Sequence, residues 1–261
     1  LPDAYRRFEA LEYCARTILS GRILGPIHSL TDEQIGAFEK QLPELMPETE
    51  AGVHSPDEAE RRSALCEIVK RGRRQGLLTA AGTASVRTQG NGFLVTPESQ
   101  PPWDPEPGDM VRVEEGKREP GGIPSRSSWL HQRIYRDNPG IRAIIQAQPP
   151  CLMAFGITRT RMDVRTIPES WIFLQDLPTL SFDEFSPDTS GIPELLSAGT
   201  PGLIIGNNSV LFTGDTLLQA FDRLEIAEFS AKSILMGAPL GKMTPISDEQ
   251  VEELRKTFLR S

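Results

Sequence analysis

The stretch from residue 123 to residue 150, IPSRSSWLHQRIYRDNPGIRAIIQAQPP, predicts a helix followed at once by a buried strand. The serines near its start suit a helix N-cap, and Pro139 ends the helix because the residue before a proline avoids helical backbone angles. The apolar run after it predicts a strand. Side chains alternate between the two faces of a strand, so we expect Gln146 and Gln148 to project together from one face.

The segments after this stretch predict two more strands and a long helix. GLIIG (202–206) and VLFTG (210–214) are short apolar runs bounded by glycine, which is typical of strands. Asp215 is the expected N-cap of a helix that continues to Met236. Apolar residues recur through this helix at spacings of three and four, which predicts one buried face.

The segments before residue 123 predict helices first and a meander of strands second. TDEQ (31–34) and SPDE (55–58) match the capping box that opens a helix, and the glycines at 72 and 76 predict the end of the second helix. From residue 84 to residue 117, short runs typical of strands alternate with glycine and proline turns. We therefore expect one domain, in which helices cover the faces of a mixed sheet, and a helical N-terminal segment.

Composition argues against several classes of partner. The chain has 261 residues and a formal net charge of −8, and its basic residues are scattered, so we expect neither nucleic acid nor a membrane as a partner. No apolar run approaches the roughly 20 residues that cross a bilayer, and the start lacks the apolar core of a signal peptide. The three cysteines are far apart and are expected to be reduced packing residues. Together these features predict a cytoplasmic protein.

Four stretches, in order along the chain, resemble the class II aldolase/adducin family of sugar-phosphate aldolases and related proteins. The resemblance implies an α/β fold of three layers (α/β/α), with a central mixed, largely antiparallel sheet flanked by helices. The helical segment at 1–58 is then expected to be an N-terminal extension packed on a class II aldolase/adducin-like domain at 59–261. The resemblance also implies a small-molecule substrate and a homo-oligomer, specifically a tetramer. The four stretches are GTASVRTQGNGFLVTPES (82–99), the stretch at 123–150, LIIGNNSVLFTG (203–214) and AFDRLEIAEFSAKSIL (220–235).

The family's metal site is altered at every position in this chain. Family members hold a divalent ion, usually zinc, with three histidines and keep a carboxylate nearby. Here the histidine positions correspond to Gln146, Gln148 and Asn208, and the carboxylate position corresponds to Ser127. Neutral amides are poor zinc ligands, so we expect no metal and no other cofactor. The histidines that the chain does contain are dispersed: His28, His54 and His131.

The family's phosphate site is altered as well. The positions that resemble it are expected to bind substrate, and they carry Thr83, Glu98, Ser99, Ser125 and Arg126. Hydroxyl groups and a helix N-terminus suit a phosphate, but Glu98 would repel a dianion unless Arg126 offset its charge. A phosphorylated sugar is therefore not the expected substrate.

These replacements favour a metal-independent enzyme on a repurposed aldolase scaffold. Without a metal ion the chemistry needs little charge stabilisation, because one amide hydrogen bond contributes only about 1 kcal/mol net. A cyclase, isomerase or carbon–carbon lyase meets this requirement, for example a pericyclic, Diels–Alder-type ring closure on a small oxygenated natural-product intermediate, since orientation alone lowers a barrier by several kcal/mol. The candidate catalytic residues are Gln146, Gln148, Asn208, Ser127 and Glu169, the last as a general acid or base.

Two other functions stay open at the level of sequence. One is a non-catalytic, adducin-like module that binds proteins, in which the amides are polar filler. The other is a metal-dependent aldolase or lyase with an atypical set of ligands.

Overall fold

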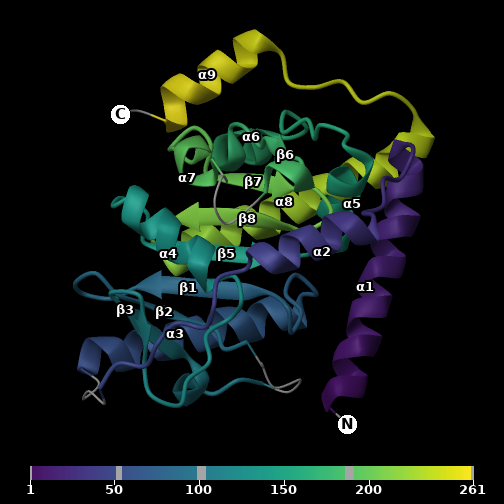
Figure 1. Ribbon diagram of the computed structural model, residues 1–261. Coiled ribbons are helices and arrows are strands. Elements are labelled where there is room, and N and C mark those ends of the chain that lie inside the picture. The colour runs from purple at the N-terminus through teal and green to yellow at the C-terminus, as the bar shows by residue number, and fades with distance from the viewer. Residues whose placement is uncertain (1, 51–54, 99–103, 186–190, 260–261) are drawn as a thin grey trace.

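An eight-stranded mixed sheet forms the centre of the computed structural model, which describes residues 2–50, 55–98, 104–185 and 191–259 (Figure 1). The strand order is β4-β3-β2-β1-β5-β8-β7-β6. Neighbouring strands pair antiparallel except β6 and β7, which pair parallel. The strands are β1 (Thr83–Arg87), β2 (Phe93–Val95), β3 (Val111–Glu114), β4 (Lys117–Arg118), β5 (Ala143–Ala147), β6 (Thr179–Leu180), β7 (Gly202–Ile205) and β8 (Ser209–Gly214).

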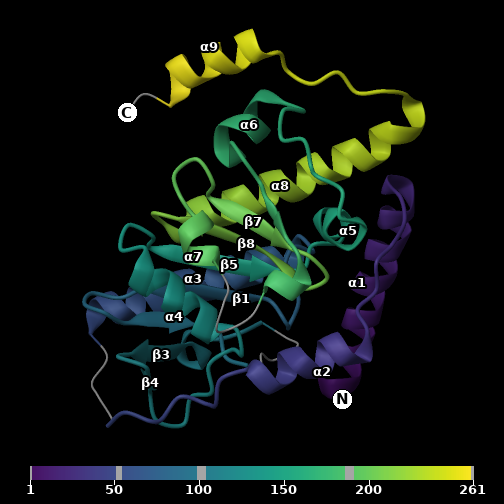
Figure 2. The same ribbon diagram turned by 45° about the horizontal axis from the view of Figure 1, so that its top comes forward.

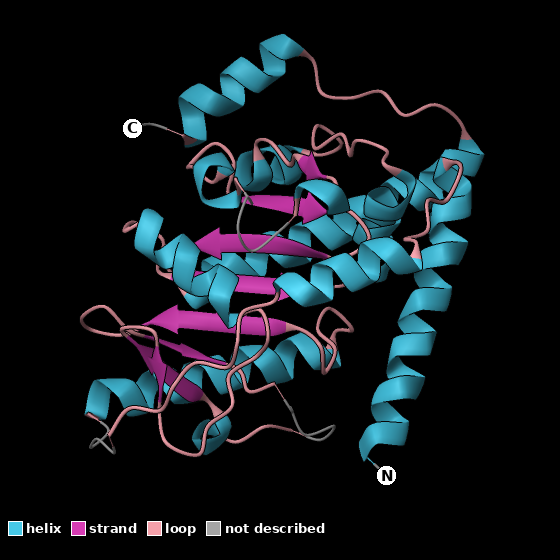
Figure 3. Ribbon diagram, viewed as in Figure 1, coloured by secondary structure: helices cyan, strands magenta, loops and turns pink. Residues whose placement is uncertain are grey.

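Helices cover both faces of this sheet, as Figures 2 and 3 show. One hydrophobic cluster joins the sheet to α3 and α8, and α5 and α6 extend that layer. A second cluster joins the opposite face to α4 and α7. The predicted α/β fold of three layers, with a largely antiparallel sheet, is confirmed. The helices are α1 (Pro2–Leu24), α2 (Asp32–Gln41), α3 (Pro56–Arg74), α4 (Ser128–Asp137), α5 (Pro150–Thr158), α6 (Pro168–Leu174), α7 (Ile192–Leu195), α8 (Leu217–Gly237) and α9 (Asp248–Phe258).

The strand register decides which side chains face α4. In β5, Ile144 belongs to the α4 cluster, whereas Ala143, Ile145 and Ala147 belong to the cluster on the α3 and α8 side. Gln146 therefore faces α4, since side chains alternate along a strand. Thr83 of β1 is its direct partner across the antiparallel pair.

The predicted caps of α2 and α3 are present, whereas Ser127 at the start of α4 makes no side-chain capping hydrogen bond and the cap of α8 differs from the prediction. Thr31 forms a complete capping box at the start of α2, and the Ser55 hydroxyl accepts the Glu58 backbone N–H at 3.2 Å at the start of α3. The prediction that Asp215 caps α8 is wrong. Thr216 is the cap, because its hydroxyl accepts the Gln219 backbone N–H at 3.1 Å. Asp215 lies one position earlier, in the turn that follows β8.

The N-terminal segment packs against the rest of the chain. α1 lies along α5, and the His28 backbone N–H donates to the Ile157 carbonyl at 2.9 Å. Beyond it, the Gln34 amide at α2 donates to the Asp183 carboxylate at 2.6 Å. The boundary between extension and domain at residue 58 stays a prediction.

Two further expectations concern surfaces. Within the described part of the chain, no helix is both long enough and apolar enough to span a membrane.

The cysteines are all free thiols, but only Cys66 is fully buried. Cys14 is exposed on α1, so its predicted role in packing is wrong, because it lies on the side of the helix that faces solvent.

Candidate functional site

Two of the three amides at the altered metal positions are joined by hydrogen bonds. Gln146 is 3% exposed, and its Nε2 donates to the Ser209 hydroxyl at 2.8 Å. The Ser209 hydroxyl in turn donates to Asn208 Oδ1 at 2.7 Å. Asn208 is half-buried in the turn between β7 and β8, beside Asn207, whose φ of 58° is left-handed. The turn therefore brings the third amide back toward the first.

Gln148 does not join this pair. It lies beyond the end of β5 and is half-buried. Its Oε1 accepts from the Thr79 hydroxyl at 3.5 Å, which is at the limit of a hydrogen bond. Its recorded side-chain contact is therefore to the loop before β1 and not to Gln146.

On the other side of Gln146, three polar residues link α4 to β1. The Ser85 hydroxyl lies 2.7 Å from His131 Nδ1 and 2.8 Å from the Tyr135 hydroxyl. His131 Nε2 and Gln146 Oε1 are buried, and neither has a partner of strict hydrogen-bonding geometry among the described residues. We call the following six residues the buried polar chain: Tyr135, Ser85, His131, Gln146, Ser209 and Asn208.

The buried polar chain carries no net charge at neutral pH. Burial lowers the pKa of His131 to about 3, and a hydrogen bond with Gln146 opposes this lowering only in part. Burial also raises the pKa of Tyr135 well above its usual value, against the opposing effects of Ser85 and Arg87. His131 is therefore a neutral imidazole with one N–H, and Tyr135 keeps its proton.

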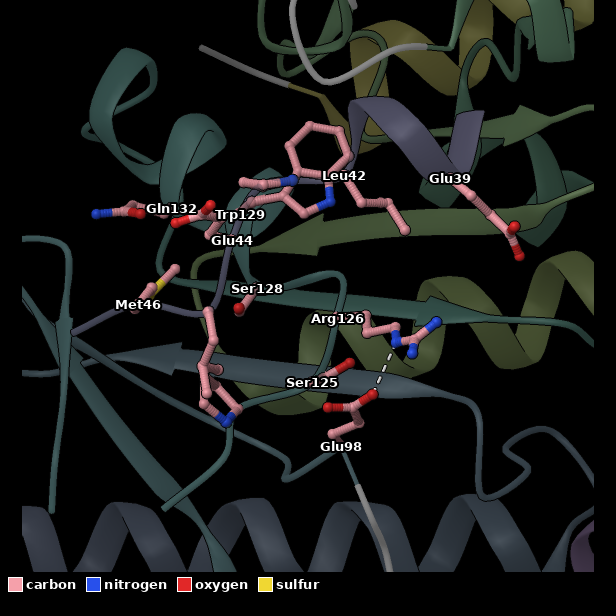
Figure 4. Close-up of a pocket in the computed structure, with 13 residues that line it drawn as sticks. Glu39, Leu42, Glu44, Met46, Glu98, Ser125, Arg126, Ser128, Trp129 and Gln132 are labelled. Atoms are coloured by element: carbon pink, nitrogen blue, oxygen red, sulfur yellow. Dashed lines mark hydrogen bonds and ion pairs between the residues drawn. The ribbon is translucent and has the colours of Figure 1, made fainter. Parts of the chain in front are cut away.

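A cavity of about 630 Å³ opens beside this chain, at the N-terminal end of α4 (Figure 4). Its wall includes Ser125, whose hydroxyl lies 2.5 Å from the Thr83 hydroxyl. Thr83 is the cross-strand partner of Gln146, so one residue separates the cavity wall from the buried amide. Another part of the wall comes from Glu39 in the last turn of α2 and from residues 42–46, which follow that helix.

The predicted substrate-binding residues gather at this cavity in part. Ser125, Glu98 and Arg126 line it, and Arg126 Nε donates to the Glu98 carboxylate at 2.7 Å. This ion pair matches the expectation that Arg126 offsets Glu98. Ser127 is the residue that precedes α4, but its side chain makes no capping hydrogen bond. Ser99 lies outside the described residues.

The lining of the cavity has more negative than positive groups. Glu39, Glu44 and Glu98 contribute three carboxylates, against the single guanidinium of Arg126. Arg126 is already paired, and 73% of its side chain is exposed. Such a site repels a phosphate dianion. Trp129 adds an aromatic surface on the α4 side (Figure 4).

The structure does not bring Glu169 to the amides. Glu169 is exposed in the first turn of α6. In that helix, Trp171 and Leu174 are buried in the hydrophobic cluster on the α3 and α8 side of the sheet. Within one chain, the sheet therefore separates Glu169 from Gln146, and the role of Glu169 as a general acid or base stays a prediction.

The partners of Gln146 were not predicted from the sequence. His131 and Tyr135 are four residues apart, which places them on the same face of α4. Ser85 is two residues after Thr83 and shares its strand face. These spacings are present in the sequence, but they do not specify which strand the helix face contacts.

The residues at the altered metal positions do not suit a zinc ion. Their donors are neutral amide oxygens, and Gln146 and Asn208 already use polar atoms in hydrogen bonds to Ser209. Within the ranges that the structure describes, no three histidine, cysteine, aspartate or glutamate side chains come together as a metal site.

Comparisons with known proteins agree with this architecture. A family model for the class II aldolase and adducin N-terminal domain matches residues 63–235. The chain belongs to the class II aldolase and adducin family.

Individual relatives of this family match at low identity. The L-fuculose phosphate aldolase of Methanococcus vannielii is 26% identical over 113 residues, which are 42% of this chain and 60% of that protein. The match therefore spans less than two thirds of that relative. The crystal structure of YgbL from Klebsiella pneumoniae has a TM-score of 0.68 and 21% identity, covering 77% of this chain and all of that one. L-fuculose-1-phosphate aldolase from Thermus thermophilus has a TM-score of 0.62 and 25% identity, covering 71% of this chain and 99% of that one.

Proposed function

We propose that this member of the class II aldolase and adducin family is a metal-independent enzyme that acts on a small, neutral, oxygenated molecule. The observation that carries the proposal is the position of Gln146 and Asn208. They correspond to metal-binding histidines by resemblance, and they are joined through Ser209. Gln146 also pairs across the sheet with Thr83, whose hydroxyl contacts Ser125 in the cavity wall.

The lining of the cavity supports a neutral substrate. Its three carboxylates disfavour the phosphorylated sugars named in relatives such as L-fuculose-1-phosphate aldolase. Trp129, Leu42 and Met46 offer apolar contact area for an organic molecule.

The reaction classes that fit are a cyclisation, an isomerisation or a carbon–carbon cleavage, with a pericyclic ring closure as one example. Holding a substrate in a reactive conformation supplies several kcal/mol without any metal. Donors that point at a carbonyl oxygen stabilise the charge that develops on it. Neutral amides and hydroxyls are the groups available for this purpose near the cavity.

The test uses purified protein and small-molecule extracts of its native cells. Extracts are incubated with wild type or with Asn208→Ala and compared by mass spectrometry. We expect a compound that wild type consumes, a product that is its isomer or its fragment, and the loss of both changes with Asn208→Ala. Turnover should be unaffected by chelator, and elemental analysis should find only substoichiometric zinc. Turnover that requires an added metal ion would contradict the proposal.

A non-catalytic binding module is the competing function, and one observation favours it. The Gln146 amide is fully buried and already donates to Ser209, so it is not itself free to hold a ligand. This function predicts a protein partner that co-purifies stoichiometrically. The partner should still bind when Gln132→Trp fills the cavity. If the protein is instead the proposed enzyme, the same variant should lose its turnover.

A further inference from the structure

The buried polar chain has a defined start at Tyr135. The Tyr135 hydroxyl is buried and protonated, and within the described residues the hydrogen bond recorded for it is to Ser85. A buried hydroxyl donor without an acceptor is costly, so Tyr135 donates to Ser85 Oγ. The single proton of Ser85 is then left for its other partner, His131 Nδ1, at 2.7 Å.

This polarity sets the tautomer of His131. A neutral imidazole has one N–H, and its Nδ1 accepts from Ser85, so the proton is on Nε2. Nε2 is buried together with Gln146 Oε1, the one atom of the Gln146 amide that otherwise lacks a partner among the described residues. The Nε2–H is therefore the donor available to Gln146 Oε1, and a small adjustment of either side chain would satisfy both buried atoms.

The hydrogen bonds keep the same donor-to-acceptor direction up to Asn208, the last residue of the buried polar chain. The Gln146 amide presents its oxygen to His131, so its Nε2 is on the side of Ser209 and donates at 2.8 Å. Ser209 then donates to Asn208 Oδ1 at 2.7 Å. Among the described residues, Oδ1 is the Asn208 side-chain atom with a recorded hydrogen bond. The amide N–H groups of Asn208, a half-buried residue, remain for another acceptor.

We propose that the buried polar chain is a one-way series of hydrogen bonds that holds the Asn208 amide with its oxygen inward, so that its NH₂ group binds an acceptor oxygen of the ligand. This inference rests on the proposed function, because it names the chemistry of that ligand. His131 and Ser209 are positioning residues: they touch no ligand and act through Asn208.

The ligand class follows from what Asn208 offers and what it lacks. Two N–H donors suit a neutral carbonyl or ether oxygen. A carboxylate or phosphate would need a cation nearby, and no ion pair or hydrogen bond among the described residues brings a cationic side chain to Asn208. A donor-only ligand such as an ammonium ion has no partner at Asn208.

Nuclear magnetic resonance tests the inference without any turnover. The protein is labelled with ¹⁵N in histidine rings and asparagine amides, and the Asn208 signal is assigned with the Asn208→Asp variant. Dimethyl sulfoxide serves as a neutral probe that only accepts hydrogen bonds, and methylammonium serves as a probe that only donates them. We expect the Nε2–H tautomer at His131, and a shift of the Asn208 NH₂ signal with dimethyl sulfoxide but not with methylammonium.

Two variants separate positioning from structure. Asn208→Asp keeps an oxygen for Ser209 but presents a carboxylate outward, so it should remain folded and lose probe binding in this turn. Ser209→Ala breaks the chain but keeps Asn208, and its NH₂ signal should respond to dimethyl sulfoxide roughly fivefold more weakly, the value of one hydrogen bond.

Each outcome is decisive for this inference alone. An Nδ1–H tautomer at His131, or an Asn208 signal that dimethyl sulfoxide leaves unmoved, would overturn it even if the enzyme converts a metabolite. Conversely, the expected spectra without any converted metabolite would leave the orientation of Asn208 established and count against the proposed enzymatic function.

Discussion

His131 is the residue on which the link between α4 and the sheet depends. Its ring is fully buried and faces Ser85 on one side and Gln146 on the other. Because His131 of α4 faces Ser85 of β1 and Gln146 of β5, its protonation state affects how α4 packs on the sheet.

The first prediction concerns the stability of the protein at acid pH. Burial lowers the pKa of native His131 to about 3, whereas an unfolded histidine titrates near 6.5. Between these values the unfolded state binds the extra proton, so the contribution of His131 is complete above pH 6.5 and declines as the pH falls. The decline is at most about 1.4 kcal/mol for each pH unit.

Urea unfolding of wild type and His131→Gln between pH 7 and pH 4.5 measures this contribution. Glutamine does not titrate and can still donate to Gln146. We expect the difference in unfolding free energy between the two proteins to shrink as the pH falls. A native His131 that titrates near pH 6.5 by NMR would contradict the prediction.

At the scale of elements, the start of α8 is a sharp test of local sequence signals. Thr216→Ala removes the hydroxyl that accepts the Gln219 backbone N–H, and this should lower the free energy of unfolding by about 1 kcal/mol. Asp215→Ala is the matched control, because Asp215 lies outside the cap and should have a smaller effect. A larger loss in Asp215→Ala than in Thr216→Ala, by urea unfolding, would restore the original expectation from the sequence.

The junction between α3 and β3 depends on a buried ion cluster. Arg62 Nη2 lies 2.7 Å from both Glu58 and Glu119, and its Nη1 donates to the Met110 carbonyl. The side chains of Arg62 and Glu58 are 8% and 6% exposed. Removing one member of such a cluster leaves a buried charge less compensated.

Arg62→Met should therefore lower the free energy of unfolding by about 3 kcal/mol or more. Arg136→Met is the control, since Arg136 is 70% exposed and its ion pair with Asp137 is at the surface. Its effect should stay below about 1 kcal/mol. Equal effects of the two substitutions in urea unfolding would show that the cluster contributes no more than a surface pair.

At the scale of the whole molecule, α1 presents apolar side chains that nothing in the described chain covers. Phe8, Leu11 and Leu19 are 68%, 67% and 63% exposed. Leu19 lies with Phe229 of α8, itself 60% exposed, around one cavity. Large exposed apolar patches mark interaction surfaces.

We expect this patch to be the contact of the predicted homo-oligomer. Phe8→Glu together with Leu19→Glu should shift the molecular mass by light scattering toward that of one chain. Leu195→Glu, at an exposed leucine on α7, is the control and should leave the mass unchanged. Wild type that is monomeric at micromolar concentration would contradict the prediction.

Local patterns in the sequence were sufficient for much of the fold. The capping box at Thr31, the proline that ends α4 and the alternation in β5 each involve neighbours within a few residues, so their physical causes lie inside the segment. The Asp215 error is of the same local kind, because two adjacent residues could both cap and backbone angles decided between them.

The site was predictable only in part. The family resemblance picked out Gln146, Asn208, Ser125 and Arg126, and the structure places the last two at the cavity. It did not indicate that Glu39 and residues 42–46 line the same cavity or that Glu169 lies beyond the sheet. Those placements depend on how segments far apart in the sequence pack.

The sequence by itself determined most of the elements and their order, because periodicity and caps are local properties. Only the tertiary structure decided that Gln146 contacts His131 and Ser209, more than ten residues away on either side. Burial sets the protonation and direction of that chain, since a polar group removed from water must find its partner within the protein. The face that α4 turns to the sheet, the register of β5 and the β7–β8 turn together determine the hydrogen-bond partners of Gln146.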